Sequence, residues 1–246
     1  MIAPPGDDAS LAGMQKPLWW LDELAHAGEE HLDEAYVTGY ERKAGFDPTE
    51  DIEILAGLGL DDTSTVIDLG AGVGTFALAV APHCREVVAV DVSPAMVTVL
   101  RDRIARADLD NVTVVEAGFL SYEHRRAPAD FVYTRNALHQ LPDFWKGIAL
   151  HRVAAILRPG GILRLRDLVF DFAPDDAGAR IEAWLAGGVS DPATGWTAAE
   201  LAEHVRIEFS TYRWLLDPLL QRTGFEILDG DVRRSAYGAY TCRRVA

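Results

Sequence analysis

Cysteine is scarce in this 246-residue chain, which contains only Cys84 and Cys242. Two cysteines provide neither the framework of a disulfide-stabilised secreted domain nor a metal-binding set. Long apolar runs are also missing: the best candidate, residues 69–84, carries three glycines and a proline, so no membrane span is expected. The first residues show no basic region followed by an apolar run, which argues against a signal peptide. We therefore expect a cytoplasmic protein without a membrane partner.

Basic residues are few in the first part of the chain. The net charge is −15, and residues 1–65 contain fifteen acidic residues against three basic ones. A phosphate backbone would be repelled by such a surface, which argues against a nucleic-acid substrate. Solubility is the simpler explanation of the acidity. No internal repeat or low-complexity segment is found, no His, Cys, Asp and Glu set has metal-ligand spacing, and a serine nucleophile elbow is missing.

One segment contains glycine at every second position. The apolar run 65–69 leads into Gly70, Gly72 and Gly74, and a helix-compatible stretch, 76–81, follows. Glycine permits positive φ and lets a ligand approach the main chain closely. The free N–H groups at the start of the following helix favour an anionic group. The pattern predicts a strand, a ligand-binding turn and a helix.

Two acids accompany this turn. Asp91 ends a second apolar strand, 86–91, where an acid commonly holds ribose hydroxyls. Asp68 precedes the first glycine by two residues. A nicotinamide-type fingerprint would place its third glycine where this chain has Thr75. The motif therefore indicates a nucleoside-bearing cofactor and leaves a degenerate dinucleotide site as an alternative.

The pattern D-x-G-x-G-x-G, with an acid ending the next strand, resembles the class I S-adenosylmethionine-dependent methyltransferases. Three further segments resemble that family in the same order, namely 111–119, 129–139 and 157–163. Four ordered signals are far more specific than one glycine loop. The resemblance implies an α/β, Rossmann-like methyltransferase fold, with a doubly wound seven-stranded sheet whose antiparallel last strand lies beside the fifth.

Periodicity and capping predict the elements. Strands are expected at 65–69, 86–91, 112–116, 129–134, 161–169, 225–228 and 237–244. Helices are expected from Pro48, after an N-cap at Asp47, to Gly57 or Gly59, then at 75–82, 94–107, 143–157 and 176–187, and from the capping box at Thr197. Pro218 marks the start of a further turn, and a helical stripe from Leu18 to Tyr40 predicts an N-terminal helical cap.

These elements give a flexible N-terminus at 1–15, a helical cap or lid at 16–60 and a cofactor-binding methyltransferase domain at 61–246. An insertion at 172–216 is rich in aromatic residues and is expected to shape the acceptor pocket. Arg164 and Arg166 interrupt the fifth strand, which indicates either alternating exposure or charges paired at the site.

The resemblance implies contacts with S-adenosylmethionine. Asp68 would reach the ammonium of the methionine part, directly or through water, and Asp91 would accept both ribose hydroxyls. Val92 and Met96 would flank adenine. Each acid could instead act as a local cap, although Ser93 already offers one for the helix at 94–107. The other positions implied to contact the cofactor are Gly70, Ala71, Gly72, Gly74, Gly118, Phe119, Arg135, Asn136 and Tyr36.

Gly118 departs from the family pattern, which commonly has an acid there that binds the adenine amino group. In this chain the contact would come from backbone, from a neighbour such as Glu116, or not at all. Phe119 could stack on adenine or fill the core. Tyr36 could cover the cofactor or belong to the core.

The segment after the fourth strand would lie beside the reactive methyl group. Asn136 could contact the cofactor, and Arg135 could bind a carboxylate of cofactor or substrate or be a surface charge. His139 is the catalytic candidate, as a base that takes a proton from the acceptor, or as an orienting residue. His204 and Glu208, in the insertion, could each be a base or a surface residue.

These observations predict a small-molecule methyltransferase that acts on oxygen or nitrogen and binds no metal. A non-catalytic S-adenosylmethionine-binding partner or regulatory module, and a nicotinamide-dependent oxidoreductase, are the alternatives. The acceptor and the oligomeric state do not follow from the sequence.

Overall fold

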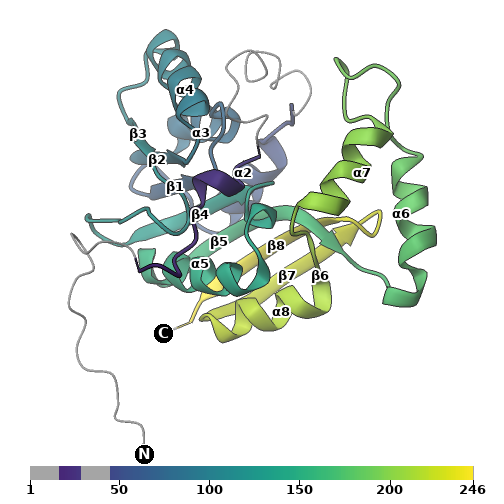
Figure 1. Cartoon of the computed structure of the whole chain (residues 1–246). Helices are drawn as coiled ribbons and strands as arrows, with labels where there is room; N and C mark the ends of the chain where they lie inside the picture. The colour runs from purple at the N-terminus through teal and green to yellow at the C-terminus, as the bar shows by residue number, and fades with distance from the viewer. Residues whose placement is uncertain (1–16, 29–44, 246) are drawn as a thin grey trace, which may run out of the picture.

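The computed structural model describes residues 17–28 and 45–245 (Figure 1). The predicted flexible segment 1–15, Tyr36 and the rest of residues 29–44 of the predicted cap lie outside the described residues. Within residues 17–28 the chain forms a turn and a short 3-10 helix, η1 (Leu24–His26), in place of the predicted α-helix. Leu21, which belonged to the predicted stripe, packs against the core from an irregular segment instead, and so does Trp20. In the described part of the chain, no helix is long and apolar enough to cross a membrane.

A twisted sheet forms the centre of the molecule, with the strand order β3-β2-β1-β4-β5-β8-β7. Strands β1 to β5 run parallel, whereas β8 lies antiparallel between β5 and β7. This order confirms the predicted fold class. The strands are β1 (Thr65–Leu69), β2 (Glu86–Asp91), β3 (Val112–Glu116), β4 (Ala129–Arg135), β5 (Leu157–Phe170), β7 (Phe225–Arg233) and β8 (Tyr237–Arg244), and the short β6 (Thr211–Tyr212) pairs with the end of β5.

Helices cover both faces because neighbouring residues of each central strand point to opposite sides. From β1, Val66 packs with α2 (Thr49–Gly57), α3 (Thr75–Val80) and α4 (Pro94–Ala107). The next residue, Ile67, packs on the other face with α5 (Asp143–Ile156) and α8 (Arg213–Arg222). The described residues also form the 3-10 helices η3 (Ala81–His83), η4 (Leu138–Gln140) and η5 (Pro174–Asp176).

The insertion carries α6 (Ala177–Leu185) and α7 (Ala198–Ile207), which project from one end of the sheet (Figure 1). The predicted capping box at α7 is confirmed, since Thr197 and Glu200 bond each other's backbone N–H groups. Several predicted boundaries were wrong, among them the end of β7, which runs to Arg233 instead of 228. Pro218 lies inside α8 rather than at its start, and β5 begins at Leu157 because that residue already pairs with Ala129 of β4.

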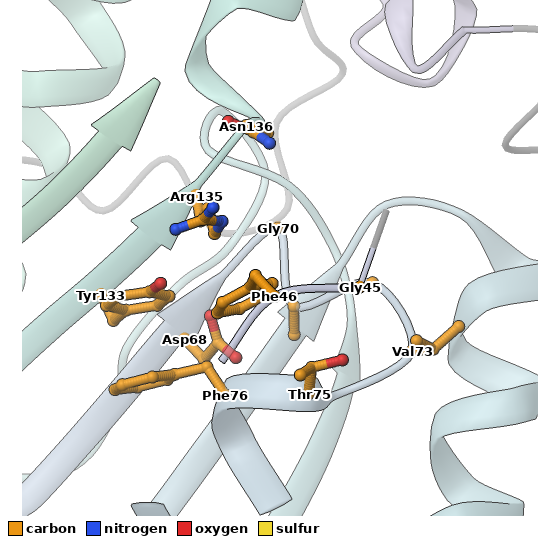
Figure 2. A pocket seen from close by; sticks show the side chains of 12 residues that line it. Gly45, Phe46, Asp68, Gly70, Val73, Thr75, Phe76, Tyr133, Arg135 and Asn136 are labelled. Atoms are coloured by element: carbon orange, nitrogen blue, oxygen red, sulfur yellow. The ribbon is translucent and has the colours of Figure 1, made fainter. Parts of the chain in front are cut away.

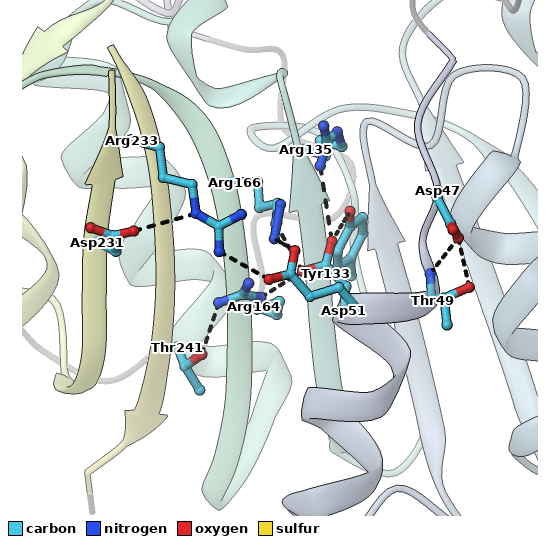
Figure 3. Close-up of polar contacts among 11 residues, drawn as sticks. Asp47, Thr49, Asp51, Tyr133, Arg135, Arg164, Arg166, Asp231, Arg233 and Thr241 are labelled. Atoms are coloured by element: carbon cyan, nitrogen blue, oxygen red, sulfur yellow. Dashed lines mark hydrogen bonds and ion pairs between the residues drawn. The ribbon is translucent and has the colours of Figure 1, made fainter. Parts of the chain in front are cut away.

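The charges within β5 are paired rather than exposed. Arg164 and Arg166 each donate from Nε to Oδ1 of Asp51 on α2, both at 2.8 Å. Tyr133 of β4 donates to the other oxygen, Oδ2, at 3.0 Å. Asp51 is only 1% exposed, so its carboxylate is a buried hub that fixes α2 across β4 and β5 (Figure 3).

Candidate active site

The glycine turn after β1 adopts a conformation that other residues rarely reach. Gly70, Gly72 and Gly74 have φ of 73°, 55° and 84°. A Cβ on Gly70 would lie 2.4 Å from Cβ of Ala137, and one on Gly74 would lie 2.2 Å from Cδ1 of Leu100. The turn is therefore glycine-rich both for its left-handed backbone and for close contact with its neighbours.

Asp91 lies at the end of β2, beside this turn. Its Oδ2 accepts from the backbone N–H of Gly72 at 2.7 Å, and its Oδ1 accepts from that of Ser93 at 2.9 Å. Burial raises the pKa of Asp91, while these hydrogen bonds oppose the rise. Ser93, not Asp91, caps α4 through the N–H of Met96. Because a carboxylate oxygen has further acceptor capacity, Asp91 can also receive hydroxyl donors from a ligand.

Two adjoining cavities share Gly70, Gly72, Arg135 and Asn136 in their linings. They open at the carboxyl ends of β1, β2 and β4, where open α/β sheets bind ligands. We name each lobe after the part of the cofactor that the resemblance implies for its acid, Asp91 or Asp68. The nucleoside lobe is also lined by Glu23, Ala27, Asp91, Val92, Ser93, Met96, Gly118, Phe119, Ala137, Gln140 and Leu141. The second, the methionine lobe, is also lined by Gly45, Phe46, Asp68, Ala71, Val73, Thr75, Phe76 and Tyr133.

Asp68 lies in the methionine lobe, beneath the glycine turn (Figure 2). It is 2% exposed, and its Oδ2 has no hydrogen-bond partner among the described residues. Burial, followed by the nearby charge of Asp91, raises the pKa of Asp68 to about 8, while the N–H of Ala77 acts in the opposite direction. An unpartnered buried carboxylate oxygen fits a ligand that brings a cationic donor, such as an ammonium group.

Arg135 and Asn136 line both lobes, and Figure 2 draws them among the residues of the methionine lobe. The guanidinium carbon of Arg135 lies 4.0 Å above the centre of the Phe46 ring, and its Nη1 is 3.9 Å from Oδ2 of Asp51. Arg135 is thus held in place rather than being a mobile surface charge. Asn136 has φ of 50°, a left-handed conformation that asparagine tolerates, and its N–H donates to the carbonyl of Arg166.

Glu23 is a lining residue of the nucleoside lobe that the sequence reading missed. It is 7% exposed, and its Oε2 accepts from the N–H of Leu120 at 2.9 Å. A Cβ on Gly118 would lie 2.4 Å from that same Oε2. By contrast Glu116, the acid considered earlier, is exposed at the end of β3. No local motif marks Glu23, because only the fold brings residues 23 and 118 together.

His139 lies in η4, immediately before Gln140, which lines the nucleoside lobe. It is 5% exposed, and among the described residues it is not part of either cavity lining. Its Nδ1 pairs with Asp167 and its Nε2 lies 3.0 Å from Oε2 of Glu208. Burial alone would lower the pKa of His139, but the two carboxylates outweigh it and raise the pKa to about 10.

Glu208 joins the two histidines of this region. It also pairs with Nδ1 of His204, and the His139 and His204 pairs lower the pKa of Glu208 against the effect of burial. His204 in turn contacts Oγ of Ser210 through Nε2 at 2.7 Å. The ligand atoms of His139, His204 and Glu208 lie within 4.8 Å of one another, so this group could hold a metal ion.

The structure thus brings together most of the predicted cofactor residues. Gly74 shapes the turn without lining either lobe, and Phe119 both lines the nucleoside lobe and packs in the core. The predicted residues that line one or both lobes are Asp68, Gly70, Ala71, Gly72, Asp91, Val92, Met96, Gly118, Phe119, Arg135 and Asn136.

A parallel sheet with an antiparallel strand beside β5, a glycine turn after β1 and an acid ending β2 define the architecture of class I methyltransferases. Comparison with known proteins agrees. A family model described as "Methyltransferase domain" matches residues 66–161. An S-adenosylmethionine-dependent methyltransferase from Clostridium acetobutylicum has a similar structure, with a TM-score of 0.65 and 12% identity over 86% of this chain and 98% of that one.

Two relatives are closer in sequence. The chain is 31% identical to 27-O-demethylrifamycin SV methyltransferase of Amycolatopsis mediterranei, over 67% of this chain and 54% of that protein. It is 33% identical to trans-aconitate 2-methyltransferase of an Azoarcus species, over 67% of each. The match therefore spans about half the length of the first relative. The chain belongs to the class I S-adenosylmethionine-dependent methyltransferases.

Proposed function

We propose that this protein transfers a methyl group from S-adenosylmethionine to an oxygen or nitrogen of a small-molecule acceptor. The observation that carries this proposal is the two-lobed crevice, with Asp91 in the nucleoside lobe and the unpartnered Asp68 in the methionine lobe. Both relatives named above are, by their names, methyltransferases of small molecules.

In this assignment the protein's own groups bind and align the cofactor. Asp91 accepts the ribose hydroxyls, Asp68 faces the ammonium, and Arg135 receives a carboxylate. Transfer from a sulfonium is an in-line displacement in which the positive charge on sulfur is lost in the transition state. A pocket that excludes water does not penalise such a reaction, and alignment supplies much of the rate.

The insertion supports a small, partly apolar acceptor. Its rings pack on one another and on the end of β5: the centroids of Phe170 and Phe172 lie 5.3 Å apart, and those of Phe172 and Tyr212 lie 5.7 Å apart. The carbonyl of His139 accepts from the N–H of Phe209, which ties the insertion to η4. We assign this junction to the acceptor side of the crevice.

His139 is our candidate base for an acceptor hydroxyl, with Asp167 holding its ring. In the described conformation Nε2 is occupied by Glu208, and the two carboxylates keep the ring protonated at neutral pH. The assignment therefore requires Glu208 to turn away, which frees Nε2 and lowers the pKa of His139. The alternative role is orientation of the acceptor. If His139 is the base, His139→Ala should lower turnover about 100-fold or more across pH 6–8. Unchanged turnover would remove it as the base.

Isothermal titration with S-adenosylhomocysteine tests the binding half of the proposal, and a missing binding signal would defeat it. Mass spectrometry of an acceptor library tests methyl transfer. A protein that binds the cofactor yet methylates none of the library would favour the non-catalytic module. Binding of a nicotinamide dinucleotide, seen by fluorescence, would favour the oxidoreductase. Turnover should survive chelator treatment, because none of the proposed steps requires a metal.

A further inference from the structure

We propose that Glu23 is the adenine-recognising carboxylate of this protein and makes the nucleoside lobe select an amino-substituted purine. This inference rests on the proposed function, since it assigns a specificity residue within the same crevice. It also accounts for the glycine at position 118, where the resemblance led us to expect an acid.

The side chain of Glu23 occupies the space that a side chain at position 118 would need. A side chain at position 118 would begin 2.4 Å from Oε2 and 2.6 Å from Cδ of Glu23. Gly118 does not have the left-handed φ that would itself require glycine. The main chain would therefore accept an acid there if Glu23 were shorter. The carboxylate reaches this part of the lobe from the N-terminal segment rather than from the loop after β3.

Only one of the two carboxylate oxygens of Glu23 has a hydrogen-bond partner among the described residues. Oε2 accepts from the N–H of Leu120, whereas Oε1 is buried and has no hydrogen-bond partner among the described residues. A buried acceptor left unpaired is unfavourable, so the lobe favours a ligand that presents an N–H donor at this point. The exocyclic amino group of adenine is such a donor. Hypoxanthine has a carbonyl oxygen in its place, which would face the carboxylate as a second acceptor.

Aromatic packing positions Glu23. The ring centroids of Trp20 and Trp145 lie 5.3 Å apart with an edge-on geometry, and those of Trp19 and Trp145 lie 5.8 Å apart. Trp145 belongs to α5, so these contacts seat the residues just before Glu23 on the body of the domain. The carboxylate is therefore held by a packed segment as well as by Leu120.

The test compares two cofactor products that differ only in the base, S-adenosylhomocysteine and S-inosylhomocysteine, by isothermal titration with the full chain. The unmodified protein should bind the adenosyl compound at least about 10-fold more tightly, because a site built to bond a donor rejects the analogue that lacks it. In Glu23→Gln the ratio should fall to within about threefold, since an amide can accept from an amino group or donate to a carbonyl. Glu116→Gln is the matched control and should keep the original ratio.

A second experiment moves the carboxylate from position 23 to position 118. Gly118→Asp alone should weaken binding of S-adenosylhomocysteine, because the new side chain meets Glu23. The double variant Glu23→Ala/Gly118→Asp should bind it more tightly than either single variant and recover selectivity against S-inosylhomocysteine. Circular dichroism and thermal unfolding of each variant establish that the fold is retained.

The outcomes separate this inference from the proposed function. Equal binding of both compounds by the unmodified protein, or a preserved preference in folded Glu23→Gln, would overturn the assignment of Glu23 and leave the methyltransferase proposal intact. If the unmodified protein bound neither compound, the proposed function itself would fail. Loss of preference in Glu116→Gln would move the role to that residue.

Discussion

Replacing Asp68 by asparagine should abolish the pH dependence of cofactor binding. The pKa of Asp68 is raised to about 8 in the free protein, so at neutral pH its carboxyl is mostly protonated. Only the carboxylate can pair with the ammonium that we place in the methionine lobe. Binding must therefore release a proton, and affinity must increase as the pH rises towards 8.

The magnitude follows from that value. With a pKa of about 8, about one molecule in a hundred carries the carboxylate at pH 6 and about half do at pH 8. The affinity for S-adenosylhomocysteine should therefore increase about 50-fold over this interval, which is about 2.3 kcal/mol. The stability of the unliganded protein has the opposite pH dependence and decreases as the pH rises. An acid with a raised folded pKa loses stability as the pH rises from about 3.9, its unfolded value, towards about 8.

Titration calorimetry at pH 6, 7 and 8, in buffers of different ionisation enthalpy, measures both the affinity and the proton release. At pH 7 about 0.9 proton should leave per cofactor bound, given the cited pKa. In Asp68→Asn affinity should be weaker at pH 8 and nearly flat with pH. Flat affinity in the unmodified protein, or an unchanged slope in Asp68→Asn, would refute the reasoning.

Three further substitutions test the crevice and its support. Asp91→Ala should weaken binding of S-adenosylhomocysteine by about 2 kcal/mol or more through lost charge-assisted hydrogen bonds; unchanged affinity would place the ribose elsewhere. Gly70→Ala puts a methyl 2.4 Å from Ala137 at a φ of +73° and should cost about 1–3 kcal/mol in urea unfolding, whereas Gly178→Ala, which meets nothing within 4 Å, should cost nothing. Leu100, on α4, is fully buried, so Leu100→Ala should lower the free energy of unfolding by about 2–5 kcal/mol. A decrease below about 1 kcal/mol would contradict its core role.

Much of the fold could be predicted because its signals are local. The strand at 65–69 and the helix at 94–107 have the observed bounds, since apolar runs and a Ser-Pro start specify them within a few residues. The position of β8 beside β5 came from the family resemblance, because no periodicity tells a strand which partner it will have.

The site could be predicted where a motif carries it, and not where distant segments meet. Asp68 precedes the first glycine by two residues, and Asp91 ends the next strand, where the motif expects an acid. Glu23 reaches the crevice across 97 residues to Leu120, and Glu208 reaches His139 from the insertion. Such contacts depend on tertiary packing, and a single residue type at an unremarkable position gives no local sign of them.

The placement of β8 has a consequence for biosynthesis. The inner edge of β5 faces β8, which is translated only after the whole insertion, α8 and β7. Until then the growing chain exposes an unpaired strand edge, the kind of surface on which intermolecular pairing starts. The nascent protein is therefore prone to aggregation from the completion of β5 until β8 is made, and slowing translation between these two strands should prolong that interval.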